Sequence, residues 1–277
     1  MKPLRKIYII FLGFLLFLGA CENPLDDKKT TQGFTLDDEQ ELGDEIHNAM
    51  VASSLFKVLS NEEGTTYFAA HQYLAGLRGK IWGTGYLEHQ RDFKWTIHIL
   101  EDDTNQRCFT TVGGKIYVTT GLLRDMVNNE AELYGVLAHE IYYADRHYHM
   151  DKLLEGYTFT EILDVKHGGS NAKALEMVGT FYNTPRNADL VHQADLLAAD
   201  IVCAIGGLSI KAFGNAIENA ELTGSDWYIN HPTPNIFSSV QERKEELNIK
   251  AVTCGNNDEN EVNLNKYLAF LDILPPR

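Results

Sequence analysis

The segment that most constrains the fold is "ELYGVLAHEIYYADRHYHM", residues 132–150. We predict that it belongs to one helix running from about residue 130 to residue 154, and that this is the central helix of the fold. The helix carries the adjacent pair His139 and Glu140. Side chains four residues apart share a helix face, and the position four residues after His139 is Tyr143.

The remaining pattern predicts an α+β fold, with a small antiparallel sheet beside a mainly helical body. Residues 93–100 alternate and are rich in β-forming residues, which is typical of a strand. "RCFTTV" and "KIYVTTG" flank Gly113 and Gly114, which predicts a hairpin with a two-residue turn. Further helices are predicted at residues 36–59, 65–82, 121–127, 172–182, 187–205, 209–223 and 238–249.

The N-terminus has the pattern of a bacterial lipoprotein. A basic start precedes an apolar run that is short for a membrane span, so residues 1–20 are predicted to be a signal peptide. The small residues before Cys21 resemble a lipobox, which implies lipidation of that cysteine. The alternative is an ordinary secretory signal with a chance cysteine. We expect a polar tether over residues 21–35 and a single domain over residues 36–277.

The charge balance argues against one class of partner. The formal net charge is −15, and it becomes about −18 once the basic residues of the signal peptide are removed. Such a surface disfavours nucleic acid and a broad electrostatic grip on anionic lipid. We therefore expect membrane attachment through the lipid on Cys21, in the bacterial cell envelope. The outer membrane is expected, on its periplasmic or surface face.

Three cysteines follow Cys21, at positions 108, 203 and 254. None is part of a C-x-x-C pair, which argues against a zinc ribbon or a thioredoxin-type site. One disulfide among Cys108, Cys203 and Cys254 is possible in an oxidising compartment, and the sequence does not assign the pair.

Three segments in order carry a resemblance to a known family. They are "VGGKIYVTTGLLRDMVNNEAELYGVLAHEI" (112–141), "HQADLLAAD" (192–200) and "NHPTPNIFSSVQERKEEL" (230–247). Together they resemble family forty-eight of the gluzincin zinc metallopeptidases, which includes HtpX-type, prenyl-protease-type and BepA-type enzymes. The resemblance implies a zincin-like metallopeptidase fold, zinc as cofactor and endopeptidase activity.

The resemblance also implies roles for particular residues. His139 stands at the first zinc ligand and Glu140 at the general base. The second and third ligand positions hold Tyr143 and Val191 in place of a histidine and a glutamate. The acid that would orient His139 corresponds to Asp195, while His231 and Arg243 match the "HP" histidine near the active site and the arginine of the last segment. One of three expected ligands is therefore retained, and a catalytic zinc normally needs three.

Other readings of these residues remain open at this point. Asp195, with His231 and His139, would form an improvised metal site, and a Tyr143 phenolate is a costly alternative ligand. His147 is about 12 Å along the predicted helix from His139, which is too far for one zinc ion. A purely structural interpretation makes His139 a core histidine that is hydrogen-bonded to Asp195. Tyr142 and Tyr143 would then fill the volume of the missing ligand and metal, and Glu140 would be a buried, hydrogen-bonded acid. On that reading His147 and His149 form a solvated helix end.

The strand before the glycine pair is a second family feature. In the family its edge binds an extended substrate by β-augmentation. This chain keeps Phe109, Gly113 and Gly114 but has Arg107 and Val112 where asparagine and proline are expected. An ordinary covered edge strand is the alternative.

The sequence therefore leads to two hypotheses. The first is a lipid-anchored envelope pseudopeptidase that binds polypeptide or a partner protein and holds no zinc tightly. The second is an active zinc endopeptidase with unusual ligands that cleaves envelope proteins. A lipoprotein that binds a small molecule has no support in the sequence.

Overall fold

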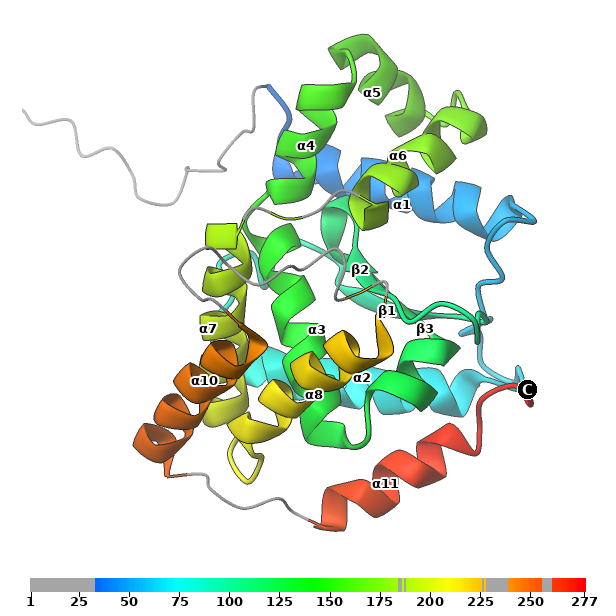
Figure 1. Ribbon diagram of the computed structural model, residues 1–277. Helices are drawn as coiled ribbons and strands as arrows, with labels where there is room; N and C mark the ends of the chain where they lie inside the picture. Colours follow the sequence, from blue (N-terminus) through cyan, green and yellow to red (C-terminus); the bar gives the residue numbers. More distant parts are fainter. Residues whose placement is uncertain (1–32, 184–185, 187, 226, 228–238, 256–260) are drawn as a thin grey trace, which may run out of the picture.

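The computed structural model describes residues 33–183, 186, 188–225, 227, 239–255 and 261–277. Figure 1 shows α3 in the middle of the molecule, with α1 and α4–α6 towards one end and α8, α10 and α11 towards the other. The elements in chain order are α1 (Leu36–Ala52), α2 (Phe68–Gly83), β1 (Thr96–Leu100), β2 (Cys108–Thr110), η1 (Val112–Gly114), β3 (Lys115–Thr119), η2 (Leu122–Met126), α3 (Glu130–Asp145), α4 (Tyr148–Gly156), α5 (Phe159–Lys166), α6 (Asn171–Asn183), α7 (Ala188–Ile205), α8 (Ile210–Thr223), α10 (Val240–Cys254) and α11 (Glu261–Leu271).

The sheet is small, as predicted, but it is mixed and not antiparallel. Its order is β1-β3-β2: β3 pairs parallel with β1 and antiparallel with β2. The chain reverses between β1 and β2 and again between β2 and β3, so β3 runs in the direction of β1. The sequence predicted the reversal between β2 and β3, from Gly113 and Gly114, but not the central place of β3.

The turn between β2 and β3 is longer than predicted. A short 3-10 turn, η1, joins the strands, and Thr111 N–H donates to the Lys115 carbonyl at 2.9 Å. Gly113 and Gly114 both have positive φ, at 69° and 76°. A Cβ on Gly113 would lie 2.6 Å from the Glu39 carbonyl oxygen on α1, so the turn packs against α1 too closely for a side chain.

The predicted helix over residues 130–154 is two helices. The first, α3, begins at an Asn129 cap whose side chain accepts from the Glu132 N–H at 2.9 Å, and all of its residues are buried. It ends at Asp145, and α4 begins after His147, whose φ of 58° is left-handed and cannot continue a helix. The short helix α5 was not predicted, although Thr158 and Glu161 form the capping box that marks its start.

Alternate strand residues face two apolar clusters. Cys108, Ile116 and Val118 belong to the cluster built around α2, α3, α7 and α8. Phe109 and Tyr117 belong to the cluster built around α1 and α4–α6. The sheet and α3 are therefore covered on both sides, which places the histidine and glutamate of α3 in the interior.

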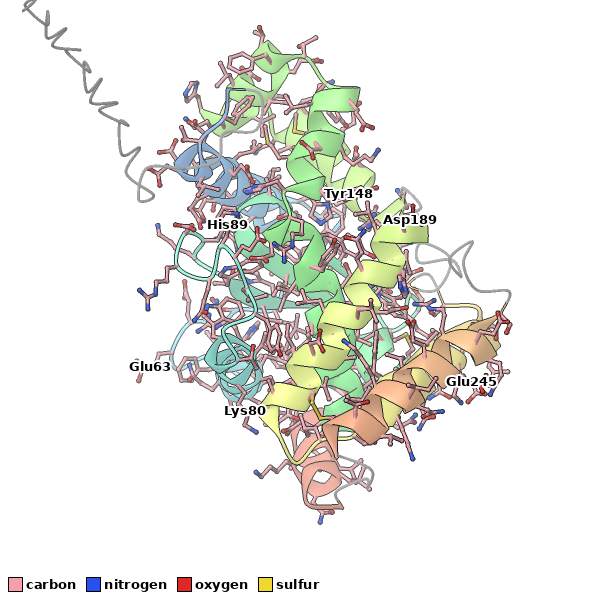
Figure 2. All side chains as sticks on the ribbon, turned by 90° about the vertical axis from the view of Figure 1, so that its left-hand side faces the viewer. Glu63, Lys80, His89, Tyr148, Asp189 and Glu245 are labelled. Carbon is pink, nitrogen blue, oxygen red and sulfur yellow. A yellow bond between two sulfur atoms is a disulfide. The ribbon has the colours of Figure 1, made fainter. Side chains whose placement is uncertain are left out.

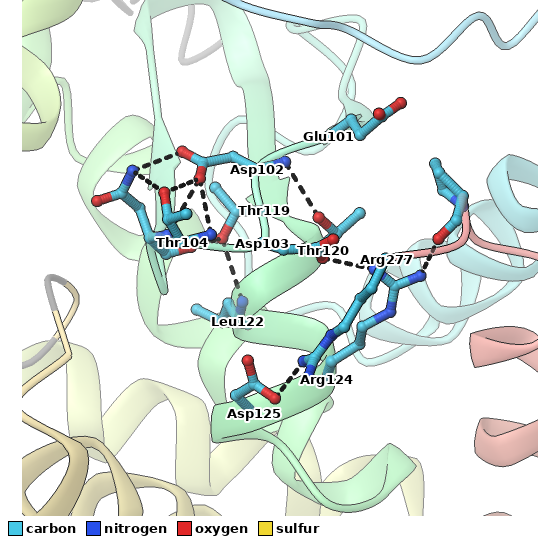
Figure 3. A network of polar contacts seen from close by, with 12 residues as sticks. Glu101, Asp102, Asp103, Thr104, Thr119, Thr120, Leu122, Arg124, Asp125 and Arg277 are labelled. Atoms are coloured by element: carbon cyan, nitrogen blue, oxygen red, sulfur yellow. Dashed lines mark hydrogen bonds and ion pairs between the residues drawn. The ribbon is translucent and has the colours of Figure 1, made fainter.

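The C-terminal segment packs against the body. The Tyr267 hydroxyl of α11 donates to the Leu123 carbonyl, and Phe270 is buried. Arg124 donates both to Asp103 and to the Pro275 carbonyl, which fixes the tail beside the loop that follows β1 (Figure 3).

A disulfide joins α7 to α10. It pairs Cys203 with Cys254, whose Cα atoms are 5.8 Å apart, and Cys108 is a buried free thiol. This answers the pairing that the sequence left open. Separately, no helix within the described residues is long and apolar enough to cross a membrane, and residues 1–32, which include the predicted signal peptide and Cys21, lie outside them.

Candidate functional site

The candidate site lies where α3, α7 and α10 meet. α3 supplies His139, Glu140 and Tyr143, α7 supplies Asp195, and α10 supplies Arg243. Figure 2 shows α7 and α10 on the face towards the viewer, with α3 behind them. All five side chains are buried, with at most 2% of each residue exposed. The site is therefore part of the core.

Both ring nitrogens of His139 have partners. Nδ1 lies 3.0 Å from Asp195 Oδ1, and Nε2 lies 3.0 Å from the Tyr143 hydroxyl oxygen. An ionised carboxylate only accepts, so Nδ1 of His139 donates to Asp195. In the neutral imidazole Nε2 is then the acceptor, and the Tyr143 hydroxyl donates a hydrogen bond to it.

The carboxylate of Asp195 is shared with Arg243. The guanidinium donates from Nε and Nη2 to the two carboxylate oxygens, each at 2.8 Å. Burial alone would raise the pKa of Asp195, but the Arg243 charge and the His139 hydrogen bond outweigh it and lower the pKa to about 2. Asp195 is therefore a permanent anion that orients His139 from one side.

Tyr143 is kept as a protonated phenol. Burial, reinforced by the charge of Glu140, raises the pKa of Tyr143 well above its usual value of 10. The guanidinium carbon of Arg186 lies 5.0 Å from the centre of the Tyr143 ring, and only 4% of Arg186 is exposed. The phenol thus fills the space beside His139 and carries a buried cation on its face.

Glu140 is bonded on its side chain and on its backbone. Its Oε1 accepts from Trp227 Nε1 at 2.8 Å, and its carbonyl accepts from the Thr110 hydroxyl at 3.1 Å. The same hydroxyl lies 2.6 Å from His149 Nε2. Trp227 is itself anchored, because its backbone N–H donates to the Gln106 carbonyl at 3.0 Å. Glu140 therefore links α3 to β2 and to the segment that follows α8.

The donor set of the described residues does not fit a catalytic zinc. His139 Nε2 is taken by the Tyr143 hydroxyl, and Val191, fully buried, has no donor atom. A catalytic zinc ion in a peptidase is normally held by three protein ligands, and the Arg186 cation beside the site opposes a dication. In the part of the chain that the structure describes, no group of three or more His, Cys, Asp or Glu side chains is placed to hold a metal ion.

The improvised metal site is not supported by the described residues. Asp195 uses both oxygens on Arg243 and faces Nδ1 of His139, so these two groups bond to each other and do not converge on a third point. The third proposed member, His231, lies outside the described residues.

The prediction of a solvated end at His147 and His149 is wrong. His149 is 1% exposed, and the imidazole of His147 is 11% exposed and hydrogen-bonded. The reason is the break after α3, which turns both side chains back into the body. His147 is therefore not on the α3 stripe at all.

The predicted substrate strand, β2, lies at one edge of the sheet. Phe109 stacks on Tyr117 of β3, with ring centres 5.1 Å apart, and the centre of the Tyr182 ring of α6 lies 5.3 Å from that of Phe109. The Arg107 guanidinium lies 4.5 Å from the centre of the Tyr182 ring. A groove of about 660 Å³ opens here, lined by the loop at residues 54–57, by residues 100–105, and by Arg107, Phe109, Thr119, Leu175 and Tyr182.

Two members of the site had no signal in the sequence. Arg186 and Trp227 lie outside the three recognised segments, and no periodicity marked them. The contact between His139 and Tyr143, by contrast, follows from their spacing of four residues.

The comparison with protein families gives one match. A sequence model of peptidase family M48 matches residues 86–233, which is more than half of the chain. The chain therefore belongs to peptidase family M48, a family of zinc-dependent peptidases. A comparison with curated proteins gave no match.

Proposed function

We propose that this chain is a pseudopeptidase: a member of the family with a zincin-like fold that does not hydrolyse peptide bonds. The observation that carries the proposal is the hydrogen bond from the Tyr143 hydroxyl to His139 Nε2, the atom that corresponds to the first zinc ligand. A tyrosine and a valine stand at the other two ligand positions, and both are fully buried. Glu140 alone cannot activate water, whose pKa is near 15.7 unless a metal lowers it.

The site instead serves the fold. Asp195, Arg243, His139 and Tyr143 form a continuous buried polar chain that links α10, α7 and α3. A buried polar network of this kind destabilises the fold when one partner is missing, and it favours one arrangement of the helices when every group is hydrogen-bonded. We infer that the residues of the former active site now hold three helices in register.

The retained function that we propose is polypeptide binding in the groove beside β2. Its volume is in the range of ligand-binding clefts, and its lining combines aromatic rings with charged groups of both signs. Phe56 and Tyr182, both partly exposed, offer apolar contacts, while Lys57 and Asp102 offer polar ones. An unfolded segment with apolar side chains fits this mixture.

We also propose that the protein is attached to the bacterial envelope through a lipid on Cys21. The support is the signal-like start of the sequence and the small residues before the cysteine. The expected face is periplasmic or surface. Release of the anchored form from membranes by detergent, but not by salt, together with its loss in Cys21→Ser, would support the anchor.

The proposed loss of activity has a direct test. The full chain, purified in detergent with zinc present, should cleave casein no faster than its Glu140→Gln variant, because the site lacks the ligands for an activating metal. Cleavage that is abolished in Glu140→Gln, together with a zinc ion that is lost in His139→Asn, would contradict the proposal. That outcome would favour the alternative, an active zinc endopeptidase with unusual ligands.

Binding is tested separately. We expect the full chain to bind fluorescent unfolded casein, and Phe56→Ala to weaken binding by about 10-fold or more, as for a buried aromatic anchor. Leu222→Ala is the matched control, since Leu222 is a 77% exposed apolar side chain on α8 that does not line the groove. If Phe56→Ala binds casein as tightly as Leu222→Ala does, the groove is not the binding site.

A further inference from the structure

Two histidines outside the former active site face each other directly. His89, in the loop between α2 and β1, and His147, at the junction of α3 and α4, have their Nε2 atoms 2.9 Å apart. His89 is labelled in Figure 2. The ring centres are 4.5 Å apart. The family match and the proposed loss of activity assign no role to this pair.

Each imidazole is held from behind by a carboxylate. His147 Nδ1 is hydrogen-bonded to Oε2 of Glu39 on α1 at 3.0 Å, and His89 Nδ1 is hydrogen-bonded to Oδ2 of Asp92 at 3.0 Å. A carboxylate accepts the Nδ1 proton, so it fixes the ring and leaves Nε2 directed at the space between the two histidines. Histidines that ligate metal ions in proteins are oriented in this way, by a carboxylate or a carbonyl on the nitrogen away from the metal.

The separation of the two Nε2 atoms suits a shared ion. Nitrogen ligands lie about 2.0–2.1 Å from a zinc ion. Two such ligands are about 2.9 Å apart when they subtend a right angle and about 3.4 Å apart in a tetrahedral site. The observed separation of 2.9 Å equals the right-angle value and is about 0.5 Å below the tetrahedral one, so the distance between the two atoms permits a shared ion.

The surroundings favour a cation. Glu39 is 1% exposed, and Asp145 and Asp151 are both close enough to interact electrostatically with His147. The imidazoles are 10% and 11% exposed, so the pair can be reached by water. Water can then complete the coordination that two protein ligands leave open.

The backbone supports the same arrangement. His147 is the sole non-glycine residue with positive φ in the described part of the chain, at 58°. Such a conformation in a residue of this kind persists where the surrounding structure imposes it, often at a ligand site. Here it points the ring of His147 towards Glu39 on one side and His89 on the other.

We propose that His89 and His147 bind one divalent transition-metal ion, with Zn²⁺ as the expected ion, and that Glu39 and Asp92 orient the two rings. With two direct protein ligands, the site is weaker than the three-ligand sites of zinc peptidases. The ion would connect α1, the loop after α2 and the junction of α3 and α4. This site is independent of the proposed loss of activity.

The test uses the full chain in detergent, stripped of metal with EDTA and titrated with Zn²⁺ by calorimetry. We expect one ion to bind, and either His89→Asn or His147→Asn to weaken binding at least about 10-fold. Asparagine keeps a donor near the position of Nδ1, and it tolerates the left-handed backbone at position 147. Titration with Cu²⁺, followed by electron paramagnetic resonance, should show nitrogen ligands in the original chain and fewer in each variant.

Two controls locate the ion. His167→Asn removes an exposed histidine outside the pair and should leave binding unchanged. His139→Asn should also leave it unchanged, because the ion is not held at the former active site. Absence of Zn²⁺ binding, or binding that is lost in His139→Asn and kept in His89→Asn and His147→Asn, would overturn the proposal. The last result would also contradict the proposed loss of activity, whereas absence of binding would not.

Discussion

The double variant Tyr143→His/Val191→Glu should bind zinc at His139, where the original chain does not. The first change frees His139 Nε2 from the Tyr143 hydroxyl and places an imidazole four residues along the same helix face. The second places a carboxylate one turn before Asp195 on α7, the helix packed beside α3. Removing even an outer partner of a zinc ligand costs up to about 100-fold in affinity, so restoring two direct ligands should gain more than about 100-fold.

The measurement is the amount of zinc that remains bound after dialysis. Every variant also carries His147→Asn, so that the proposed site at His89 and His147 does not contribute. The matched control is Tyr142→His/Val191→Glu, which introduces the same residue types on a different face. Tyr142 points to Gln193, with the two side-chain oxygens 2.5 Å apart, and not to His139. A folded Tyr143→His/Val191→Glu variant with no more zinc than the control would show that the ligand positions are assigned wrongly.

Arg243→Met should destabilise the protein by about 3–5 kcal/mol, the usual cost of breaking a buried ion pair from one side. Arg243 is 1% exposed and makes two hydrogen bonds to Asp195. Its loss leaves a buried carboxylate that only His139 partly satisfies. The free energy of unfolding in urea measures the effect.

The adjacent residue on the same helix is the control. Lys244 also forms an ion pair, with Glu218, but the Glu218 side chain is 42% exposed. Lys244→Met should therefore cost less than about 1 kcal/mol. If the two variants lose equal stability, the buried pair does not hold α7 and α10 together as proposed.

The sequence predicted the helical body well because its signals are local. Helix starts follow from capping residues, and the start of α3 at Asn129 and Glu130 agrees with the prediction. The end of α3 was missed because nothing local stops it: His147 adopts a left-handed conformation through its contacts with Glu39 and His89. These partners lie far from it in the sequence.

The sheet was only partly predictable for the same reason. The glycine pair indicated a reversal between β2 and β3, and the structure has one. Which strand lies in the centre depends on long-range pairing. Thr96 of β1 pairs with Lys115 of β3, although β2 lies between these two strands in the sequence. No pattern within either strand encodes that choice.

The candidate site was also predicted only in part. The family pattern and helix spacing brought His139, Tyr143 and Asp195 to one place, and the structure puts these three in contact. Neither pattern pointed to Arg186 or Trp227, because both lie outside the three family segments and outside the predicted helices. Their places in the site depend on tertiary structure, which a single sequence does not display.

The disulfide gives α7 and α10 a covalent attachment in addition to their polar contacts. Asp195 and Arg243 join the two helices in the interior, and Cys203 and Cys254 join them again further along, at or near their C-terminal ends. A helix pair fixed at two separated points cannot swing about either one. Reduction of the covalent link would leave the polar contacts, which include Asp195–Arg243 and Lys250–Asp200. Part of the rigidity of this helix pair therefore depends on the redox potential around the protein. Such a link persists outside the reducing cytosol, in compartments such as the bacterial periplasm.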